Sequence, residues 1–582
     1  SARIAKLPGV RLVEAYREYE HNTDVGPALI GAPAAWAGTI NQPGGAPAVQ
    51  GEGIVFGIID SGVNFGSPSF AATDPVDGYV HENPLGAGVY LGTCDVGGDD
   101  AGRCNSKLIG GYDFVCAAPG NQCGVANVRE EPGFGDTNGH GSHTASTAGG
   151  NRRDVEFGGA PLRISGVAPR ANIIAYDACY TNTSTGQGLC PNVSTVASIN
   201  QAVADGVDVI NYSIGGGAQP WSEATSLAFL DATDAGVFVA TSAGNSGPAP
   251  NTMGHLEPWT SSTAASQHGR GGFAFLMQVT GPDPVPAPWQ PIVLNSGTGG
   301  VAFSATIPGN TRLFISPGFA TPSDACDGAA LPAGTFAGGI AVIRRGTCSF
   351  SIKANNATAA GAIAVVIANN SAGVIIPSVP GTTIPVFSVT QAEGDALGSF
   401  GNANPATATA QIGFPPVGLP NVADALASFS SRGPAGNFNL IKPDVTAPGV
   451  SILATLAGTT ITGSEQLVGA ISGTSMASPH NAGAAALIRQ AHPTWTVAEI
   501  KSALLMTATA QVYLEDQVTL ATPFARGSGR IRLERAIRAG LVMDETKANY
   551  LAANPGTGGF THTLNLPSMA RANCAQTCQN VR

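Results

Sequence analysis

Three continuous apolar runs stand out along the chain, and each one stops at polar residues. They are GEGIVFGIID at 51–60, GVDVINYSIGG at 206–216 and GVFVATSAGNSG at 236–247. Such runs are typical of strands that a parallel sheet buries on both faces. Stretches with a helical pattern, 196–205 and 223–235, precede the second and third runs. This alternation predicts an α/β fold with a doubly wound parallel sheet.

Residues capable of chemistry fall where these predicted strands end. Asp60 ends the first run, Ser213 lies near the end of the second, and Asn245 lies near the end of the third. In open parallel sheets, ligands bind at the carboxyl ends of the strands. We therefore expect a functional site at this edge of the sheet.

The pattern changes after about residue 270. Residues 280–420 are rich in Pro, Gly, Val and Thr, and 338–370 has the order strand, helix, strand. The first pattern returns at 428–434 and 442–449. We therefore predict a separate module that is inserted into the first domain.

Three further stretches complete the outline of the chain. A long helix is expected to begin near Ser475 and to continue through AGAAALIRQAH at 482–492. Residues 1–21 are more charged than the residues after them and have the character of the end of a different unit. Residues 546–582 again lose the α/β pattern.

Composition excludes several classes of protein. Of 582 residues, 43% are hydrophobic and 12% are charged, which indicates a folded protein. The net charge is −11 and there is no long basic stripe, which argues against a nucleic-acid partner. The longest apolar runs, such as 361–368, are far shorter than the roughly 20 residues of a membrane span.

The cysteines occur in close pairs. An even number of cysteines in local pairs, without any C-x-x-C, favours structural disulfides formed outside the cytosol over a metal cluster or free thiols. The chain does not begin with Met, so we expect a processed form from which a secretion signal has been removed. Pairing by proximity gives Cys94 with Cys104, Cys116 with Cys123, Cys179 with Cys190, Cys326 with Cys348, and Cys574 with Cys578.

Two histidines lie close together in NGHGSHTASTAGG at 138–150. His140 and His143 are three residues apart, so on a helix they share a face and could bind a metal. The motif lacks the Glu of H-E-x-x-H and any obvious third ligand. The alternatives are that one histidine is a general base, or that both are only packed. Asp60 is then either a turn residue or the acid that orients such a histidine.

Four hydroxyl groups lie within SGTSMASPHNAG at 472–483. Ser475 is expected at the start of the long helix, where backbone N–H groups and the helix dipole favour negative charge. Ser472 and Thr474 could simply cap the helix. His480 lies five residues after Ser475, roughly 140° around the helix, and is therefore poorly placed to act as its base.

Four motifs resemble those of the subtilase family of serine peptidases. They are IIDSGV, HGSHTAS, SAGNSGP and GTSMASPH, and they place Asp60, His140 and Ser475 in the order Asp, His, Ser that is typical of subtilisin. The resemblance covers most of 22–545 apart from the insertion. Ser142 stands where many members carry Thr, which is a conservative difference.

The resemblance implies a role for each matching residue. Ser475 is the nucleophile, His140 the general base, and Asp60 the residue that supports His140. The amide of Asn245 and the backbone N–H of Ser475 form the oxyanion hole. Two further segments line the substrate-binding site, one pairing with an extended peptide and both forming walls of the primary pocket: Ser213, Ile214 and Gly215, and Ser242, Ala243 and Gly244.

The insertion resembles a protease-associated (PA) domain, most clearly at IAVIRRGTCSF and at IPVFSVTQAEGDAL. Plant-type and pyrolysin-like secreted subtilases have this arrangement. The N-terminal stretch resembles the last strand of an inhibitor propeptide, and LNLPSMA resembles the start of a fibronectin-type-III-like domain. The resulting division is a propeptide remnant at 1–21, the catalytic domain at 22–310 and 411–545, the PA domain at 311–410, and a linker with a truncated C-terminal region at 546–582.

We therefore expect a secreted, extracellular serine endopeptidase that acts on proteins or peptides and whose own propeptide inhibits it. The alternative is an inactive pseudo-peptidase that binds peptides through the cleft and the PA domain. The chemistry requires no cofactor. Structural calcium is possible without an assigned site, because Asp99 and Asp100 favour a solvated acidic turn. The oligomeric state is unknown.

Overall fold

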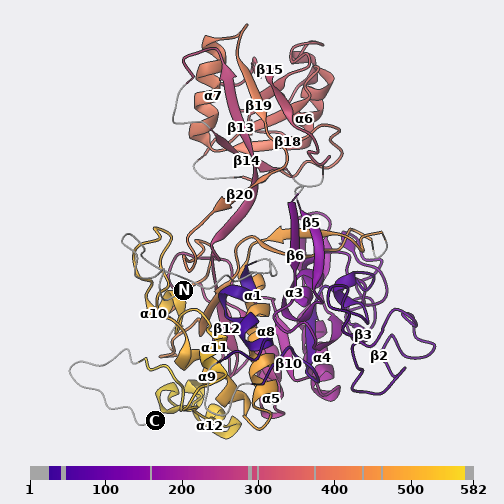
Figure 1. Ribbon diagram of the computed structural model, residues 1–582, viewed down its shortest axis with the longest axis vertical. Helices are drawn as coiled ribbons and strands as arrows, with labels where there is room; N and C mark the ends of the chain where they lie inside the picture. The colour runs from indigo at the N-terminus through magenta and orange to yellow at the C-terminus, as the bar shows by residue number, and fades with distance from the viewer. Residues whose placement is uncertain are drawn as a thin grey trace, which may run out of the picture. The chain divides into compact units, whose positions relative to one another are not determined.

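The computed structural model describes residues 25–40, 47–157, 160–285, 291–297, 300–371, 375–434, 438–460 and 463–570. The predicted propeptide remnant at 1–21 and the pair Cys574 and Cys578 lie outside these ranges. The chain divides into two compact units (Figure 1). The first comprises Ser1–Val155, Leu162–Gly269 and Val422–Arg582, and the second comprises Glu156–Pro161 and Arg270–Asn421.

The first unit is built on a parallel sheet with the order β2-β3-β7-β1-β10-β11-β12-β21. This confirms the predicted doubly wound parallel sheet. Its strands are β1 (Val55–Asp60), β2 (Leu91–Gly92), β3 (Leu108–Asp113), β7 (Asn172–Asp177), β10 (Val209–Tyr212), β11 (Phe238–Ser242), β12 (Ser261–Ser266) and β21 (Val445–Pro448).

Helices cover both faces of this sheet because successive side chains of its strands point to opposite sides. Phe56 and Ile58 of β1 join one buried cluster, with α3 (His140–Gly149), α8 (Thr474–Ala491) and α9 (Val497–Thr507). Ile59 joins the other, with α4 (Asn192–Ala204) and α5 (Ala224–Asp234). The continuous apolar run at 51–60 thus supplies both cores.

Shorter elements complete the first unit. They are α1 (Gly26–Leu29), α2 (Ala32–Trp36), β4 (Val128–Arg129), β8 (Tyr180–Asn182), β9 (Gln187–Leu189), β22 (Ile452–Thr455), β23 (Val468–Ile471), α10 (Pro523–Arg526), α11 (Leu533–Ala536) and α12 (Lys547–Ala552). Strands β5 (Arg153–Phe157) and β6 (Ala160–Ile164) pair with each other, and each is divided between the units, because Glu156–Pro161 belong to the second.

The C-terminal stretch differs from the predicted linker. Tyr550, Leu564 and Leu566 are buried in the same cluster as α4 and α5. The Trp221 indole N–H also donates to the carbonyl of Tyr550 over 2.9 Å. This burial left no sign in the sequence, because the apolar residues of the stretch do not follow the periodic pattern of a helix or a strand. Three side chains of the C-terminal stretch therefore belong to the first unit's core.

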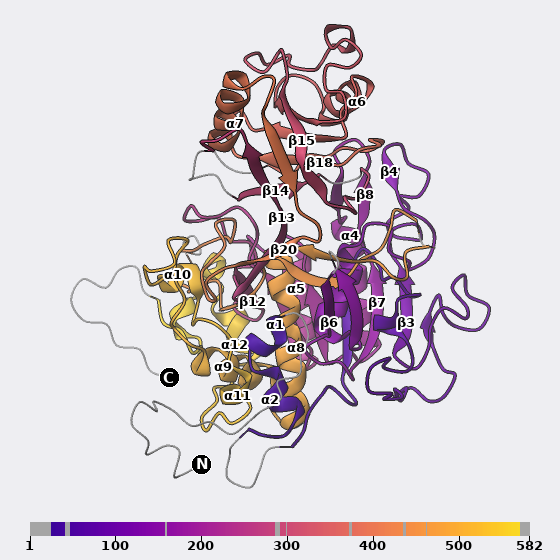
Figure 2. The same ribbon diagram turned by 45° about the horizontal axis from the view of Figure 1, so that its top comes forward.

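The second unit holds a mixed sheet with the order β14-β18-β17-β16-β15-β19-β13-β20. Its helices α6 (Phe350–Ala359) and α7 (Gln391–Ala403) flank the strands (Figure 2). The strands are β13 (Arg270–Gly281), β14 (Ile292–Ser296), β15 (Ile307–Ile315), β16 (Ile340–Arg344), β17 (Ala364–Ala368), β18 (Val386–Val389), β19 (Thr409–Ile412) and β20 (Val417–Pro420).

This unit is larger than the insertion predicted at 311–410. Strands β13 and β14 precede residue 311, yet they hydrogen-bond with β19 and β18 from the far end of the unit. The change of residue pattern near 270 corresponds to the start of this unit. Long-range antiparallel pairing leaves no local sign in the sequence, so the bounds 311–410 left out β13 and β14. The strand, helix, strand order predicted for 338–370 corresponds to β16, α6 and β17.

Disulfides join neighbouring cysteines in both units. Among the described residues they are Cys94–Cys104, Cys116–Cys123 and Cys179–Cys190 in the first unit, and Cys326–Cys348 in the second. These pairs are the ones expected from proximity in the sequence.

Candidate active site

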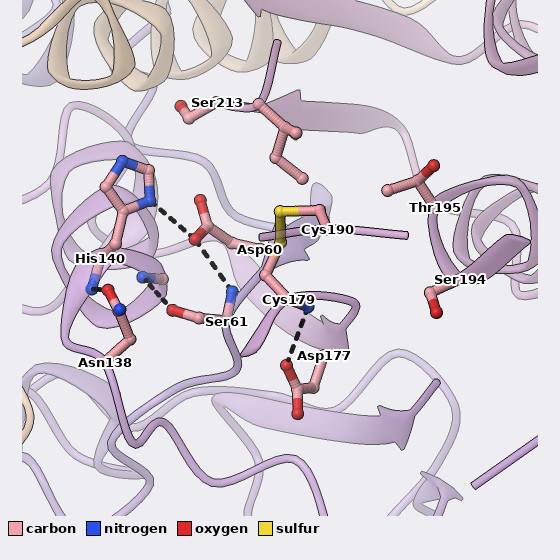
Figure 3. The surroundings of a disulfide bond; sticks show 12 residues. Asp60, Ser61, Asn138, His140, Asp177, Cys179, Cys190, Ser194, Thr195 and Ser213 are labelled. Carbon is pink, nitrogen blue, oxygen red and sulfur yellow. Dashed lines mark hydrogen bonds and ion pairs between the residues drawn. A yellow bond between two sulfur atoms is a disulfide. The ribbon is translucent and has the colours of Figure 1, made fainter. Parts of the chain in front are cut away.

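Asp60 is the last residue of β1, and its carboxylate is buried among hydrogen-bond donors. Ser61 N donates to Asp60 Oδ1 over 2.9 Å, and the Thr144 hydroxyl donates to Oδ2 over 3.3 Å. His140 Nδ1 lies 2.7 Å from the same Oδ1, and the ring is turned toward the carboxylate (Figure 3). Because a carboxylate accepts hydrogen bonds, Nδ1 carries the proton and Nε2 is left for chemistry.

Helix α3 begins at His140, and a second carboxylate holds its first turn in place. Asp136 is buried and accepts from Gly139 N over 2.7 Å and from Ser142 N over 2.8 Å. It also accepts the Ser61 hydroxyl over 3.1 Å, which ties this turn to the end of β1. Asp136 was not among the predicted site residues. The available signal was an acid just before a helix start, where a carboxylate is favoured.

The contact with Asp60 changes the acidity of the His140 ring. Burial by itself lowers the pKa of His140, because it disfavours the charged ring. The charge of Asp60 and its hydrogen bond outweigh burial and raise the pKa above the ordinary value of 6.5. The ring is thus a stronger base than a free histidine, which suits a group that accepts a proton and then holds it.

The Cys179–Cys190 disulfide lies on the other side of Asp60 from His140 (Figure 3). It follows β7, whose last residue, Asp177, lies beside Asp60 in the parallel register. Ala178 N donates to the Asp60 carbonyl over 2.8 Å. The disulfide therefore closes the loop directly after the strand that supports Asp60.

Ser475 is the second residue of α8, one position later than the helix start. Its hydroxyl donates to the Ser213 carbonyl over 3.2 Å, and its own carbonyl accepts the Ser213 hydroxyl over 2.8 Å. That carbonyl is available because Pro479, four residues on, has no N–H to donate to it. Within the described residues, the Ser475 hydroxyl bonds Ser213 and not His140. The hydrogen bond between a nucleophile and its base is often long or poorly aligned until substrate binds.

Asn245 lies against the start of α8 with its amide held in one orientation. Asn245 Oδ1 accepts from Thr474 N over 2.9 Å and from the Thr474 hydroxyl over 2.8 Å. The Nδ2 donor therefore points away from Thr474. A Cβ added at Gly473 would lie 3.5 Å from Asn245 Nδ2 and 3.6 Å from Ser475 N. These two N–H donors thus border the same small space, which glycine leaves open.

The predicted substrate-binding residues lie on two neighbouring strand ends. Ser213, Ile214 and Gly215 follow β10, and Gly215 is exposed. Ser242 ends the adjacent strand β11, and Gly244 follows it with a φ of 101°, in the left-handed region that favours glycine. Ala243, in contrast, is fully buried.

The other two histidines of the sequence motifs are packed in the interior. His143 Nε2 lies 2.8 Å from the Ile452 carbonyl, and His480 Nδ1 lies 2.8 Å from the Met476 carbonyl. Burial lowers the pKa of each ring to about 4. Both rings therefore stay neutral near pH 7.

A metal-binding cluster is absent from the part of the chain that the structure describes, where no three His, Cys, Asp or Glu side chains are placed to hold an ion. The expectation of a solvated turn at Asp99 and Asp100 holds only for Asp99, which is exposed. Asp100 is buried, and it pairs with Arg103 and accepts from Phe134 N. Tertiary contacts, which the local sequence did not reveal, account for this difference.

These groups belong to one class of chemistry. A carboxylate-bound histidine, a hydroxyl at a helix start and converging N–H donors are what serine hydrolases use for acyl transfer. The fold adds that all of them lie at the carboxyl ends of parallel strands, or at the helix starts that face them.

Comparison with known proteins identifies the family within this class. A sequence model of the subtilase family matches residues 51–269 and 295–529. Similar proteins include Subtilisin-like protease SBT1.6 of Arabidopsis thaliana, at 33% identity, and Subtilisin-like protease SBT1.7 of the same plant, at 30%. Minor extracellular protease Vpr of Bacillus subtilis (strain 168) is 32% identical.

The matches cover 84%, 96% and 83% of this chain and 65%, 72% and 55% of the three relatives. The chain therefore belongs to the subtilase family. The chain spans less than two thirds of the first of these relatives. Among the described helices, none combines the length and apolar character that crossing a bilayer requires.

Proposed function

We propose that this protein is a secreted serine endopeptidase that cleaves peptide bonds through an acyl-enzyme, with Asp60, His140 and Ser475 as its triad. The observation that carries the proposal is the hydrogen bond from His140 Nδ1 to the buried carboxylate of Asp60. It leaves Nε2 as the basic nitrogen at the end of the sheet where Ser475 also lies.

The first half of the reaction forms the acyl-enzyme. His140 Nε2 takes the proton of the Ser475 hydroxyl as Oγ attacks the carbonyl carbon of the scissile bond. The developing oxyanion is bound by Asn245 Nδ2 and Ser475 N, the two donors beside Gly473. The imidazolium, stabilised by Asp60, then protonates the leaving amine as the C–N bond breaks.

The second half releases the acid product. Water takes the place of the amine, gives a proton to His140 Nε2 and attacks the ester carbon. The same donors bind the second oxyanion, and the proton returns to Ser475 Oγ as the ester bond breaks. No step requires a metal or an organic cofactor.

Secretion, substrates and inhibition are inferred from the disulfides and from the family. The disulfides favour an oxidising, extracellular compartment, and one relative is named an extracellular protease. The separate second unit supports the PA resemblance. Protein and peptide substrates, inhibition by the enzyme's own propeptide, and any structural calcium follow from the family resemblance alone.

The decisive experiment compares two serines of one motif. Ser475→Ala is expected to abolish casein hydrolysis and labelling by a fluorophosphonate probe, because both require the Oγ nucleophile. Ser472→Ala is the control: this hydroxyl accepts only a bond from Ser451 N among the contacts described for it. Ser472→Ala should retain both activities. Near-normal hydrolysis by Ser475→Ala would refute the proposal.

A further inference from the structure

Behind the predicted substrate-binding segment lies a buried pair of a histidine and a carboxylate that the proposed chemistry does not use. His255 and Glu257 are each at most 1% exposed. His255 Nε2 lies 2.8 Å from the Ile214 carbonyl, and Nδ1 lies 3.3 Å from Glu257 Oε1. Buried charged groups are costly unless paired, so this pair calls for an explanation in terms of what it holds.

The hydrogen bonds define the state of this pair. Burial by itself raises the pKa of Glu257, but His255 and Lys442 together hold that pKa below its ordinary value. Glu257 and the Ile214 carbonyl are both hydrogen-bond acceptors, and the two ring nitrogens of His255 face one of them each. The Ser226 hydroxyl donates to Glu257 Oε1 over 2.8 Å and helps to fix the carboxylate.

The backbone around His255 grips the same segment. His255 N donates to the Gly216 carbonyl over 2.7 Å, and Leu256 N donates to the Gly217 carbonyl over 2.9 Å. Gly254 N donates to the Ala243 carbonyl over 3.1 Å, which belongs to the other predicted wall. Residues 254–256 therefore bridge the two strand ends that are proposed to bind substrate.

The packing leaves little freedom for this arrangement. The Tyr212 ring stands edge-on to the His255 ring, with centroids 5.5 Å apart. A Cβ added at Gly217 would lie 2.3 Å from Glu257 Oε1. The His255 ring thus contacts the Ile214 carbonyl on one side and the Glu257 carboxylate on the other. The Ile214 carbonyl is bound on the buried side, while Gly215 remains exposed.

We infer that His255 is a positioning residue for substrate: held by Glu257, it fixes the Ile214 carbonyl from the buried side and so keeps the Ser213–Gly215 backbone in shape to pair with an extended peptide. This inference rests on the proposed function. Peptides that add to a strand are bound by main-chain hydrogen bonds, whose strength depends on the receptor backbone being held in place. His255 should therefore affect the binding of long substrates and not the chemistry at Ser475.

The test uses His255→Asn in the full chain. His255 has a φ of 53°, a left-handed conformation that Asn also tolerates, so the backbone is preserved while the ring is lost. We expect kcat/KM for an extended peptide substrate to fall about tenfold, mainly through KM, the size of one buried hydrogen bond. Hydrolysis of a short blocked amino-acid ester and the rate of fluorophosphonate labelling should stay near wild type.

A matched control separates positioning from general loss of packing. His81 is also buried, and its Nε2 lies 2.7 Å from Asn151 Oδ1, away from the predicted walls. His81→Asn should lower thermal stability without changing the dependence of KM on peptide length. An unchanged KM for long peptides in folded His255→Asn would overturn the inference, as would an equal loss of labelling. Absence of labelling in the wild-type protein would instead refute the proposed function.

A second pair of variants keeps the inference testable if His255→Asn does not fold. Glu257→Gln preserves size and can still hydrogen-bond Nδ1, whereas Glu257→Leu preserves size but leaves Nδ1 without that partner. KM for the long peptide should rise more in Glu257→Leu than in Glu257→Gln, by about threefold to tenfold. Equal KM values in the two variants would overturn the inference.

Discussion

The two helices that begin at the candidate site, α3 and α8, start differently from α7 and α9. Helix α9 opens with a capping box, in which Thr496 accepts from Glu499 N and Glu499 accepts from Thr496 N; α7 opens with the same device. Helices α3 and α8 instead follow a glycine, and within the described chain neither glycine position offers a side-chain cap. In α7 and α9, side chains of the helix start itself accept hydrogen bonds from its free N–H groups.

At the site, distant residues take the place of the local cap. At α3, Gly141 N donates to the Ser61 hydroxyl over 3.0 Å, although the two residues are 80 positions apart. At α8, Thr474 N donates to Asn245 Oδ1, across 229 positions. The unfilled N–H groups of these helices therefore join separate parts of the chain into one site. The next N–H, at Ser475, is the one proposed to bind the oxyanion.

The largest effect is expected from breaking the link between β1 and α3. Asp60→Asn replaces the acceptor for His140 Nδ1 with an amide that can select the wrong tautomer. In a Ser-His-Asp triad this lowers kcat by about 10⁴. Steady-state hydrolysis of a peptide substrate measures the loss. A decrease of less than tenfold would contradict the role proposed for Asp60.

The next effect tests the link between Asn245 and α8. Asn245→Ala is expected to lower kcat by about 10²–10³ with little change in KM, a magnitude borrowed from the oxyanion donor of subtilisin, a member of the same family. The physical reason is that one of two donors to the oxyanion is lost. A loss confined to KM would show that Asn245 binds substrate instead.

The pH dependence of activity tests the pairing of His140 with Asp60. His140 must be neutral to accept the serine proton, and Asp60 raises the pKa of the ring above 6.5. kcat/KM should therefore rise about tenfold per pH unit at low pH and level off at higher pH. The midpoint of this rise should lie above pH 6.5. In Asp60→Asn the residual activity should show a lower midpoint, because only the charge of Asp136 then opposes the effect of burial. Identical midpoints would contradict this account.

The raised pKa of His140 also has a consequence for stability. The folded state binds the proton more tightly than the unfolded chain, so this contribution is fully present below the unfolded pKa. It is lost as pH rises through the higher folded pKa. The stability that comes from the Asp60 and His140 pair thus decreases over the pH range in which activity increases.

The smallest effect is expected at the locally capped helix. Thr496→Ala removes the cap of α9 and should lower the free energy of unfolding by about 1 kcal/mol. The side-chain contacts of Thr496 are with Glu499 and Asp544 and not with the predicted site residues, so kcat and KM should not change. Thermal unfolding and peptide kinetics measure the two parts. A changed kcat would show that local caps also serve the site.

Several elements could be predicted from residue pattern, because neighbouring residues in the sequence determine them. The run at 51–60 predicted β1, and the run at 482–492 predicted the long helix α8. Asp60 was singled out because it ends an apolar strand, and His480 was set aside by helix geometry. Asp136 and His255 were missed, and Thr474 was considered only as a helix cap, because what makes each of them useful is a partner elsewhere in the chain.

Residue pattern was enough to predict the parallel α/β unit, the presence of an inserted module and the family motifs, since periodicity and short motifs depend on neighbouring residues. Tertiary structure alone decided which groups meet. It paired Asp60 with His140, oriented Asn245 through Thr474, buried Asp100 and placed the His255 and Glu257 pair behind Ile214. Hydrogen bonds between residues far apart form only when the sheet brings strand ends and helix starts to a common edge.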